Sequence, residues 1–234
     1  MGLVVSALPA TMIVVTPTRA RRPSPAQLDR ATSATLSALK DPAAVENLRL
    51  FYDRDSNYAG RSFLAVGPVE YDTITAADLY ATSLLGISVG PRAGRQLLQG
   101  GPHRNDVIKA LRSVPVETDL ADADDAVLDA AEHLHLQLKN ALGGNKWVAA
   151  SKLCARKRPR LFPVRDSLVT RGLLGVGQDR RIDWLVYQHL MTDDEVQGLL
   201  RDVTRESAVR ESDLHDPPLR ILDVVLWMHV KTAG

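Results

Sequence analysis

The sequence predicts an all-α fold, in which short helices form one compact domain behind a flexible N-terminal segment. Apolar residues recur at spacings of three and four over most of the chain, as on the buried face of a helix. Ser, Thr or Asp residues precede many of these runs, and Gly and Pro residues end them. The pattern contains no alternation of apolar and polar residues long enough for a regular strand. We therefore expect a single helical domain over residues 24–234.

The composition is that of an ordinary soluble protein. The chain has 234 residues, enough for one domain with a substantial core. Its 29 Lys and Arg residues nearly balance its 28 Asp and Glu residues, so net charge neither favours nor excludes a nucleic-acid partner. The single cysteine, Cys154, excludes an intrachain disulfide and any metal site built from several thiolates, and it suits a reducing cytoplasm. We expect this cysteine to be a small buried residue, and we expect no metal and no other cofactor.

Residues 1–23 are predicted to be a flexible or β-prone leader. Residues 2–15 are largely apolar, but no basic segment precedes them and Pro9 interrupts them, so they do not match a secretory signal peptide. The run is also too short and too polar to cross a bilayer. We therefore expect no membrane partner.

The first half of the domain is predicted to contain several short helices. The first begins at Ser24 and keeps apolar residues at helical spacing up to Leu39. Asp41 is the predicted N-cap of the second, with Pro42 at its first position. Residues 63–71 could form a short β-segment beside the Gly-Pro turn. Further short helices are expected over residues 92–99 and 105–113.

Two capping patterns mark helix starts. Thr75 and Asp78 stand three apart ahead of an apolar run, a capping-box spacing that predicts a helix over residues 76–87. Thr192 and Glu195 form the T-x-x-E version and predict a helix over residues 193–206.

Two longer patterns complete the fold. Residues 120–142 carry apolar residues on one face and acidic residues on the other, which predicts a long amphipathic helix. His133 and His135 in this helix are two apart and so lie on different faces, which argues against a shared metal ion. A helix that follows Asp216 and two prolines is apolar nearly all round, and we expect it to be central and buried. The remaining expected helices cover residues 146–157 and 181–191.

Two segments of opposite charge lie close together in the sequence. Residues 144–165 contain seven basic residues and no acidic one, whereas residues 117–132 contain seven acidic residues. The basic segment could hold phosphates through Lys and Arg contacts. Alternatively, the two segments screen each other or face water, as charge runs usually do.

The turn that starts the basic segment is rich in glycine. Gly143, Gly144 and Asn145 can all adopt positive φ, and they lead into a helix whose first N–H groups favour an anion. The alternative is an ordinary turn between helices. The residues that we predict to contact nucleic acid are Gly143, Gly144, Asn145, Lys146, Lys152, Arg156, Lys157, Arg158 and Arg160.

Two carboxylates are of interest beyond the basic segment. Pro159 and Pro163 end the basic helix, and Asp166 follows as an N-cap for the next helix. An N-cap carboxylate can also act on a substrate if it faces a cleft, so Asp166 is the candidate catalytic residue. Asp223 interrupts the most apolar helix and needs a partner, for which Lys152, Arg156 and Arg158 are candidates.

Three segments together resemble an actinobacterial family of proteins of unknown function. They are residues 150–169, residues 75–82 and residues 221–228, which read ASKLCARKRPRLFPVRDSLV, TAADLYAT and ILDVVLWM. The resemblance covers the chain from about Leu48 onward and implies no activity.

Residues 141–173 also resemble, more distantly, the hairpin-and-aspartate region of helix-hairpin-helix DNA glycosylases of the adenine glycosylase and endonuclease III type. That resemblance implies a helix-hairpin-helix core, a phosphate-binding hairpin at Gly143 to Lys146, and Asp166 as the acid that stabilises the sugar cation. The chain has Asn145 at a hairpin glycine position and Trp147 where bifunctional members carry a lysine, so the resemblance implies hydrolysis without lyase activity. The cysteine cluster of endonuclease III is absent.

Three functions follow from these observations. The first is binding of DNA or RNA backbone phosphates by residues 143–160. The second is a monofunctional glycosylase-like hydrolase that uses Asp166. The third is a non-enzymatic protein whose acidic segment 117–132 or an apolar pocket binds a partner or small ligand. The sequence does not indicate an oligomeric state.

Overall fold

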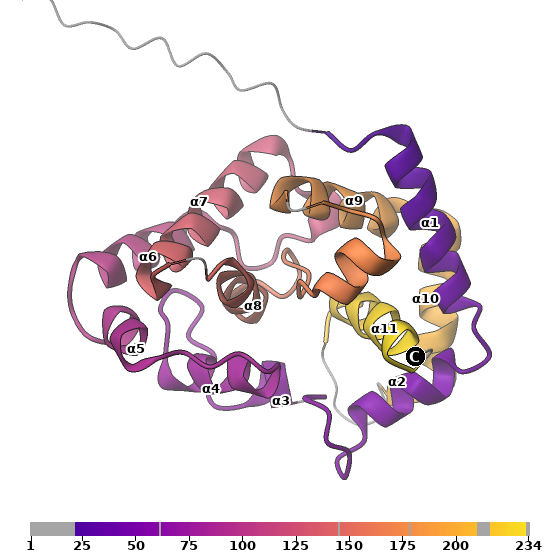
Figure 1. The fold of residues 1–234 in the computed structure, drawn as a ribbon, viewed down its shortest axis with the longest axis horizontal. Coiled ribbons are helices and arrows are strands. Elements are labelled where there is room, and N and C mark those ends of the chain that lie inside the picture. The colour runs from indigo at the N-terminus through magenta and orange to yellow at the C-terminus, as the bar shows by residue number, and fades with distance from the viewer. Residues whose placement is uncertain (1–21, 61, 145, 178, 210–215, 233–234) are drawn as a thin grey trace, which may run out of the picture.

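The computed structural model describes residues 22–60, 62–144, 146–177, 179–209 and 216–232, and every regular element in these ranges is helical. Two groups of helices lie side by side in Figure 1. The group at the left, from the middle of the chain, comprises α3 (Ser62–Ala65), α4 (Ala76–Leu84), α5 (Pro91–Leu98), α6 (Pro102–Ser113), α7 (Asp125–Leu142) and α8 (Trp147–Lys157). The other group, from the two ends, comprises α1 (Pro25–Leu39), α2 (Ala44–Tyr52), α9 (Arg180–Thr192), α10 (Asp194–Glu206) and α11 (Pro218–Thr232).

Two short helical segments lie in the connections between these helices. The 3₁₀ turn η1 (Leu120–Asp122) precedes α7 and packs on α9, and the π-helical η2 (Leu168–Leu173) packs on α11. The prediction of an all-helical fold is confirmed for the described residues. Residues 1–21 of the predicted leader lie outside them.

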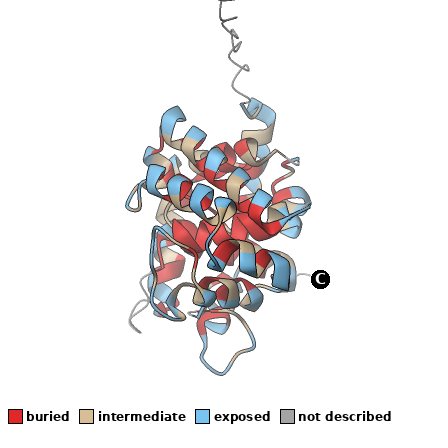
Figure 2. Cartoon of the chain, turned by 90° about the vertical axis from the view of Figure 1, so that its left-hand side faces the viewer, coloured by how far each residue is buried: buried red, intermediate tan, exposed pale blue. Residues whose placement is uncertain are grey.

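Buried residues run through the centre of the molecule, whereas exposed residues lie on its outer parts (Figure 2). In the left-hand group α8 packs against α4 and α7, while in the other α11 packs against α1, α2 and α10. The prediction that α11 is a central helix is confirmed, because its residues are buried without interruption from Leu219 to Leu226. The same is true of α8 from Ala149 to Lys157, although that helix ends in two cations, Arg156 and Lys157.

Two N-terminal caps follow directly from the sequence. Ser24 caps α1, and its backbone N–H donates to the side chain of Gln27 in a complete capping box. Thr75 caps α4, and its backbone N–H donates to Oδ2 of Asp78 at 2.8 Å. Both pairs are only three residues apart, so the sequence is sufficient to find them.

Two other predicted caps were wrong. Asp41 accepts a hydrogen bond from the N–H of Ala43 in a tight turn, and α2 begins only after that residue. The cap of α10 is Asp193, whereas the hydroxyl of Thr192 donates backward to carbonyl groups of α9. In both places a short polar side chain bonded to the nearest backbone group, a local alternative to the predicted cap.

Two predicted elements also differ from the structure. The helix expected over residues 120–142 is interrupted, because Asp124 adopts an extended backbone and accepts from the N–H of Val127 as the true N-cap of α7. The short β-segment considered for residues 63–71 is absent, and that stretch begins in α3. Its later carbonyl groups bind side chains of α8, as described below.

Candidate active site at the junction of the two helix groups

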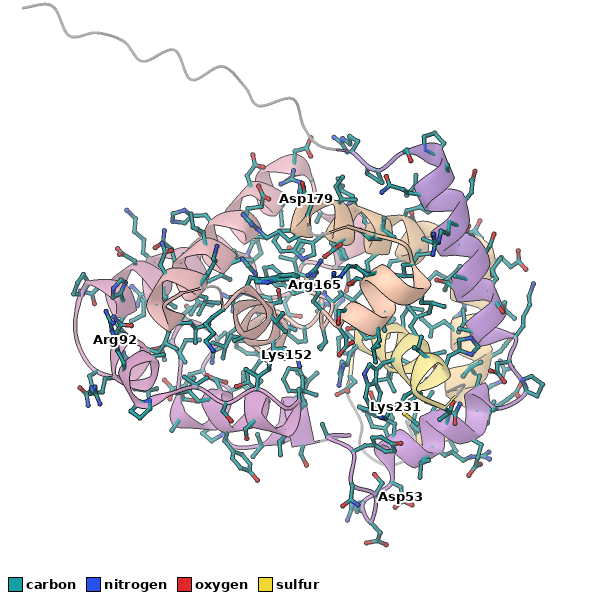
Figure 3. All side chains as sticks on the ribbon, in the orientation of Figure 1. Asp53, Arg92, Lys152, Arg165, Asp179 and Lys231 are labelled. Carbon is teal, nitrogen blue, oxygen red and sulfur yellow. The ribbon has the colours of Figure 1, made fainter. Side chains whose placement is uncertain are left out.

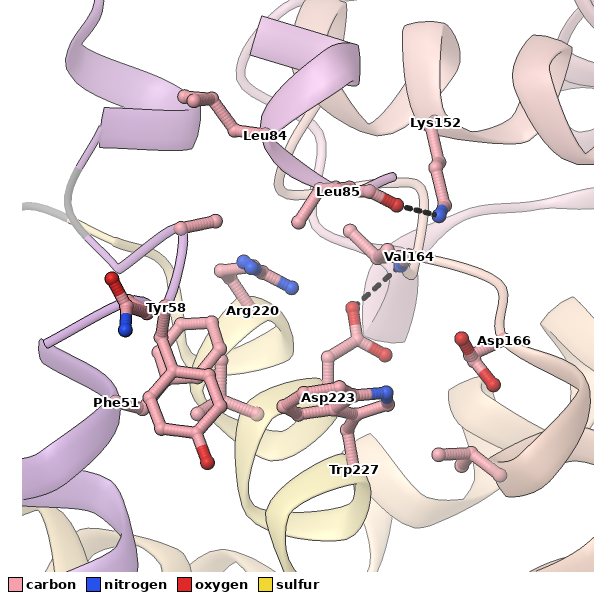
Figure 4. Close-up of a pocket in the computed structure, with 14 residues that line it drawn as sticks. Phe51, Tyr58, Leu84, Leu85, Lys152, Val164, Asp166, Arg220, Asp223 and Trp227 are labelled. Atoms are coloured by element: carbon pink, nitrogen blue, oxygen red, sulfur yellow. Dashed lines mark hydrogen bonds between the residues drawn. The ribbon is translucent and has the colours of Figure 1, made fainter. Parts of the chain in front are cut away.

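A cavity of about 310 Å³ lies where the two helix groups meet (Figure 4). A volume of this size is at the lower end for small-ligand pockets, which span roughly 300–1,000 Å³. Both groups contribute to the wall: Tyr58 follows α2, Leu85 follows α4, Lys152 lies on α8, Asp166 precedes η2, and Arg220 and Trp227 lie on α11.

Asp166 reaches the cavity because the chain before it is extended. Pro159 and Pro163 prevent continuation of α8, and residues 162–166 form no regular element. In an extended segment successive side chains point in opposite directions. Arg165 accordingly packs over the ring of Trp147, 3.8 Å from its centre, while Asp166 lines the cavity.

The carboxylate of Asp166 is only partly occupied by its capping role. Its Oδ1 accepts a hydrogen bond of 2.9 Å from the N–H of Leu168 at the start of η2. No described residue donates to its Oδ2, and the side chain is half-buried. The predicted cap and the predicted approach to a cleft are therefore both present in one residue.

Lys152 faces the same cavity from α8. Its Nζ donates to the carbonyl oxygen of Leu85 at 2.6 Å, and its side chain is otherwise enclosed by protein (Figure 4). Burial lowers the pKa of Lys152, and the positive charge of Arg220 acts in the same direction, whereas the charge of Asp166 opposes both. The amine is thus within the electrostatic influence of the candidate catalytic carboxylate.

Asp223 is the second carboxylate of the cavity. Its Oδ2 accepts from the N–H of Val164 at 2.5 Å, and the hydroxyl of Tyr187 lies beside it without a regular hydrogen bond. Burial raises the pKa of Asp223 to about 7, although Arg220, the Val164 N–H and Tyr187 act to lower it. The expected pairing of Asp223 with Lys152, Arg156 or Arg158 was wrong, because those cations bind other groups.

Aromatic rings form another part of the wall. The Tyr58 ring is nearly parallel to the Phe51 ring, at 23° with centres 5.6 Å apart, and it is nearly perpendicular to the Trp227 ring, at 84° and 5.8 Å. All three residues line the cavity. Such rings offer apolar faces on which a planar ligand can stack.

Two cations of the predicted nucleic-acid surface are buried against one acid. Arg156 donates from Nε to Oδ1 of Asp78 at 3.1 Å, and Lys157 forms an ion pair with the same carboxylate. The remaining donors of Arg156 bind the carbonyl groups of Phe63 and Val66, at 2.7 Å each. These side chains hold the stretch after α3 against α8, and they are not available at the surface.

Arg158 and Arg160 are also engaged internally. Arg158 is buried and donates to the carbonyl groups of Tyr71, Leu111 and Val114 at 2.7–2.8 Å. Arg160 donates to Asp119 of the acidic segment at 2.5 Å. Figure 3 places Lys152 and Arg165 near the middle of the molecule, in contrast to Arg92 and Asp53 on its outside. The burial of Lys152, Arg156, Lys157 and Arg158 therefore removes most of the predicted basic surface.

The glycine turn remains exposed. Gly143 and Gly144 have φ of 74° and 63°, as predicted, and nothing lies within 4 Å of the position that a Cβ would take. Lys146 is exposed and precedes α8, whose start has no side-chain cap, while Asn145 lies outside the described residues. The contact between Trp147 and Arg165 joins this turn to the segment that carries Asp166.

Three of the seven acids in the acidic segment pair with α9. Arg181 donates to both Asp125 and Asp129, and Arg180 lies 3.7 Å from Glu132. The pair between Arg160 and Asp119 joins the basic and acidic segments, as one of the two expectations had it. The other partners of the acidic segment come mainly from α9. Five of its seven acids, Glu117, Asp122, Asp124, Asp125 and Asp129, are nevertheless exposed, so the interaction surface considered above stays a prediction.

His135 is buried and bonded to neighbouring groups of α8. Its Nε2 lies 3.1 Å from both the Trp147 carbonyl and the Ser151 hydroxyl, and burial lowers its pKa to about 4. No group of three metal-binding side chains occurs among the described residues. None of the described helices is long and apolar enough to cross a membrane.

Sequence reasoning missed Arg220 and the aromatic wall. Arg220 and Asp223 are three apart on a helix that is otherwise apolar from Leu219 to Met228, so they share one face. That spacing was a usable signal. Nothing in the sequence indicated that Phe51 and Tyr58, from the opposite end of the chain, would complete the site.

Residues 44–230 match a family described as a family of unknown function (DUF6308). No curated protein and no solved structure matches the chain. The predicted likeness to a family without an assigned function is therefore confirmed. The likeness to helix-hairpin-helix glycosylases and the actinobacterial source stay predictions.

Proposed function

The chain belongs to the family of unknown function DUF6308, a membership that assigns no activity, and we propose that it hydrolyses an N-glycosidic bond of a nucleoside-sized ligand in the central cavity. The observation that carries this proposal is the position of Asp166. Its carboxylate lines a cavity that also contains aromatic rings, a buried amine and a second carboxylate. We propose Asp166 as the catalytic residue.

The chemistry of the bond matches this set of groups. When the bond between the anomeric carbon and the base nitrogen breaks, positive charge develops on the sugar, and a nearby carboxylate stabilises it. Oδ2 of Asp166 is available for this role, because only Oδ1 is used in capping η2. Either the ring of Tyr58 or the ring of Trp227 would stack on the planar base.

Asp223 would supply the proton that the leaving base requires. With a pKa of about 7, its carboxyl group is about half protonated near neutral pH, as a general acid needs to be. In the balanced reaction the base nitrogen takes this proton and a water oxygen bonds to the anomeric carbon. One proton of that water then restores the acid, so the products are the free sugar and the free base.

Release of free base from nucleosides, nucleotides and oligonucleotides by the purified chain would test the proposal. Asp166→Asn keeps an acceptor for the Leu168 N–H but removes the charge, and we expect base release to fall at least 100-fold while circular dichroism is unchanged. Asp193→Asn is the matched control, since Asp193 caps α10 at 2.9 Å but does not line the cavity. Equal base release by Asp166→Asn and the unsubstituted chain would rule out the proposal.

A second measurement separates hydrolysis from lyase chemistry. Lys152 has a lowered pKa and lies in the cavity, two properties that an imine-forming lysine requires. However, its Nζ is bonded to the Leu85 carbonyl, and we propose that it acts only as a cation beside Asp166. Borohydride added during turnover should then trap no protein–sugar adduct, and an adduct lost in Lys152→Met would show that the enzyme is a lyase.

Binding of DNA or RNA at the glycine turn is the second candidate function. Its support is the exposed turn at Gly143 and Gly144, joined through Trp147 and Arg165 to the segment of Asp166. Because four of the predicted basic residues are buried, only Lys146 and the backbone N–H groups would contact phosphates there. Fluorescence anisotropy of labelled oligonucleotides at increasing salt would test this function, and we expect a shallow salt dependence.

A further inference from the structure

Arg220 is a buried arginine whose donors are not all used. Its side chain lines the cavity and the residue is 5% exposed. Its Nε and Nη2 have no hydrogen-bond partner among the residues that the structure describes. Its guanidinium carbon lies 5.5 Å and 5.2 Å from the ring centres of Phe51 and Phe63, contacts that engage the face of the guanidinium and leave its N–H edge unused.

Two other buried arginines, Arg156 and Arg158, show the contrast. Arg156 and Arg158 use Nε, Nη1 and Nη2 in hydrogen bonds to carbonyl and carboxylate oxygens. A buried charged donor without an acceptor is costly, and native structures keep few of them. The unpaired donors of Arg220 therefore lack an acceptor that the described residues could provide.

No ion pair neutralises Arg220 within the part of the chain that the structure describes. Asp223 is three residues away on α11, but its Oδ2 is bonded to the Val164 N–H. Asp216, one turn before Arg220, accepts a hydrogen bond from the hydroxyl of Tyr52 at 2.8 Å. Lys152 adds a second cation to the cavity, and its hydrogen bond goes to a neutral carbonyl.

The free donors have the geometry of an oxyanion site. The Nε–H and one Nη2–H point in the same direction from one edge of the planar guanidinium, a spacing that matches two oxygens of a carboxylate or phosphate. Such bidentate pairing is what distinguishes arginine from lysine in anion recognition. Both nitrogens are enclosed by protein in this orientation, so the edge must turn toward the cavity, where an entering oxyanion would satisfy both donors and balance the charge.

We propose that Arg220 binds the terminal phosphate of the substrate, so that the ligand of this cavity is a free nucleoside monophosphate. This inference rests on the proposed N-glycosidic hydrolysis for the identity of the remainder of the ligand. Arg220 and Asp166 lie on different sides of the cavity, with Asp223 and Val164 between them (Figure 4). A phosphate at Arg220 would thus anchor one end of the ligand while the glycosidic bond lies toward Asp166.

A terminal phosphate fits a buried arginine better than a polymer does. A phosphate monoester ends a molecule and can enter an enclosed site, whereas a phosphodiester within DNA or RNA carries chain on both sides. The cations that would hold such a chain on the outer surface are instead buried, as shown by Arg156 and Arg158. The two observations together favour a small nucleotide over nucleic acid.

Isothermal titration calorimetry on the full chain carrying Asp166→Asn, which prevents turnover, would test the inference. The probes are the four common ribonucleoside 5′-monophosphates, the four matching nucleosides, and inorganic phosphate. We expect at least one monophosphate to bind tenfold or more tightly than its nucleoside, and inorganic phosphate to bind weakly at the same site. Equal affinities for every pair, or no binding of any monophosphate, would overturn the inference.

Substitutions then identify the residue responsible. Arg220→Gln should abolish the preference for the monophosphate, whereas Arg205→Gln, at a side chain on α10 that is 70% exposed, should leave it unchanged. If Arg220→Gln fails to fold, Arg220→Lys keeps the charge without the paired donors and should reduce the preference at least threefold. A full preference in either folded variant at residue 220 would overturn the inference.

The outcome also separates this inference from the proposed hydrolysis. Preferential binding through Arg220 without base release by the unsubstituted chain would leave the phosphate site intact and reject the hydrolase. Base release that depends on Asp166 but is the same for nucleoside and monophosphate would support the hydrolase and reject the phosphate site.

Discussion

Arg156 and Asp78 form an ion pair in which neither side chain is accessible to solvent, with Nε and Oδ1 3.1 Å apart. The same carboxylate pairs with Lys157 and accepts the N–H of Thr75, so one acid compensates two cations and completes the capping box of α4. A buried charge without its partner destabilises a protein strongly.

We therefore predict that Asp78→Asn lowers the free energy of unfolding by about 3–5 kcal/mol, because two cations lose their counter-charge. Asp72→Asn is the control: Asp72 pairs with Arg158, but its side chain is 55% exposed, so we expect a loss of at most about 1 kcal/mol. Urea denaturation of both variants would measure the difference. Equal losses would show that Asp78 contributes no more than a surface acid.

Asp223 should make stability fall as pH rises. Its pKa is raised to about 7 in the folded chain from 3.8, so between these values the folded state holds a proton that the unfolded state has released. The neutral carboxyl therefore stabilises the fold at low pH, and this contribution is lost as pH rises through about 7. From pH 5 to pH 8, Asp223→Asn should gain about 3 kcal/mol relative to the unsubstituted chain. A constant difference between the two chains would contradict the assignment.

His135 should have the opposite effect. Burial lowers its pKa to about 4 from 6.5, so between these values the unfolded state binds a proton that the folded state does not. Stability should fall as pH decreases from 6.5 toward 4, by about 2 kcal/mol between pH 7 and pH 5. His135→Gln should remove this slope in urea titrations, and His133→Gln, at an exposed position of the same helix, should retain it.

Cys154 should not react with thiol reagents in the folded chain. The thiol is inaccessible to solvent and burial raises its pKa, so little thiolate forms and no reagent reaches it. We expect no reaction with a chromogenic disulfide under native conditions and one thiol per chain in denaturant. Rapid native labelling would mean that α8 opens readily, which its complete burial from Ala149 to Lys157 argues against.

The sequence predicted those features that depend on neighbouring residues. Capping at Thr75 needs only a partner three residues away, and the stop at Pro159 needs none. Apolar periodicity located most helices for the same reason, within a few residues at their ends. The position of Asp166 was also predictable in part. Pro159 and Pro163 indicate that the preceding helix ends and that an extended segment leads to Asp166.

The features that the sequence did not reveal depend on long-range pairs. Arg156 is 78 residues from Asp78, so a basic segment that could have formed a binding surface lies inside the protein. Lys152 is 67 residues from Leu85, whose carbonyl group determines where that amine points. The number of charges along the chain could not distinguish an exposed basic surface from buried cations. It shows neither how far a side chain is buried nor which carbonyl groups surround it.

The residues that line the cavity come from widely separated parts of the chain. Its wall combines Phe51 near one end of the chain, Lys152 in the middle and Trp227 near the other end. A fragment that begins after Phe51 or ends before Trp227 therefore loses part of the site. A bound ligand would act as a non-covalent cross-link between the two helix groups, so that occupancy should slow their separation and protect the connection between Lys157 and Asp179 from proteases.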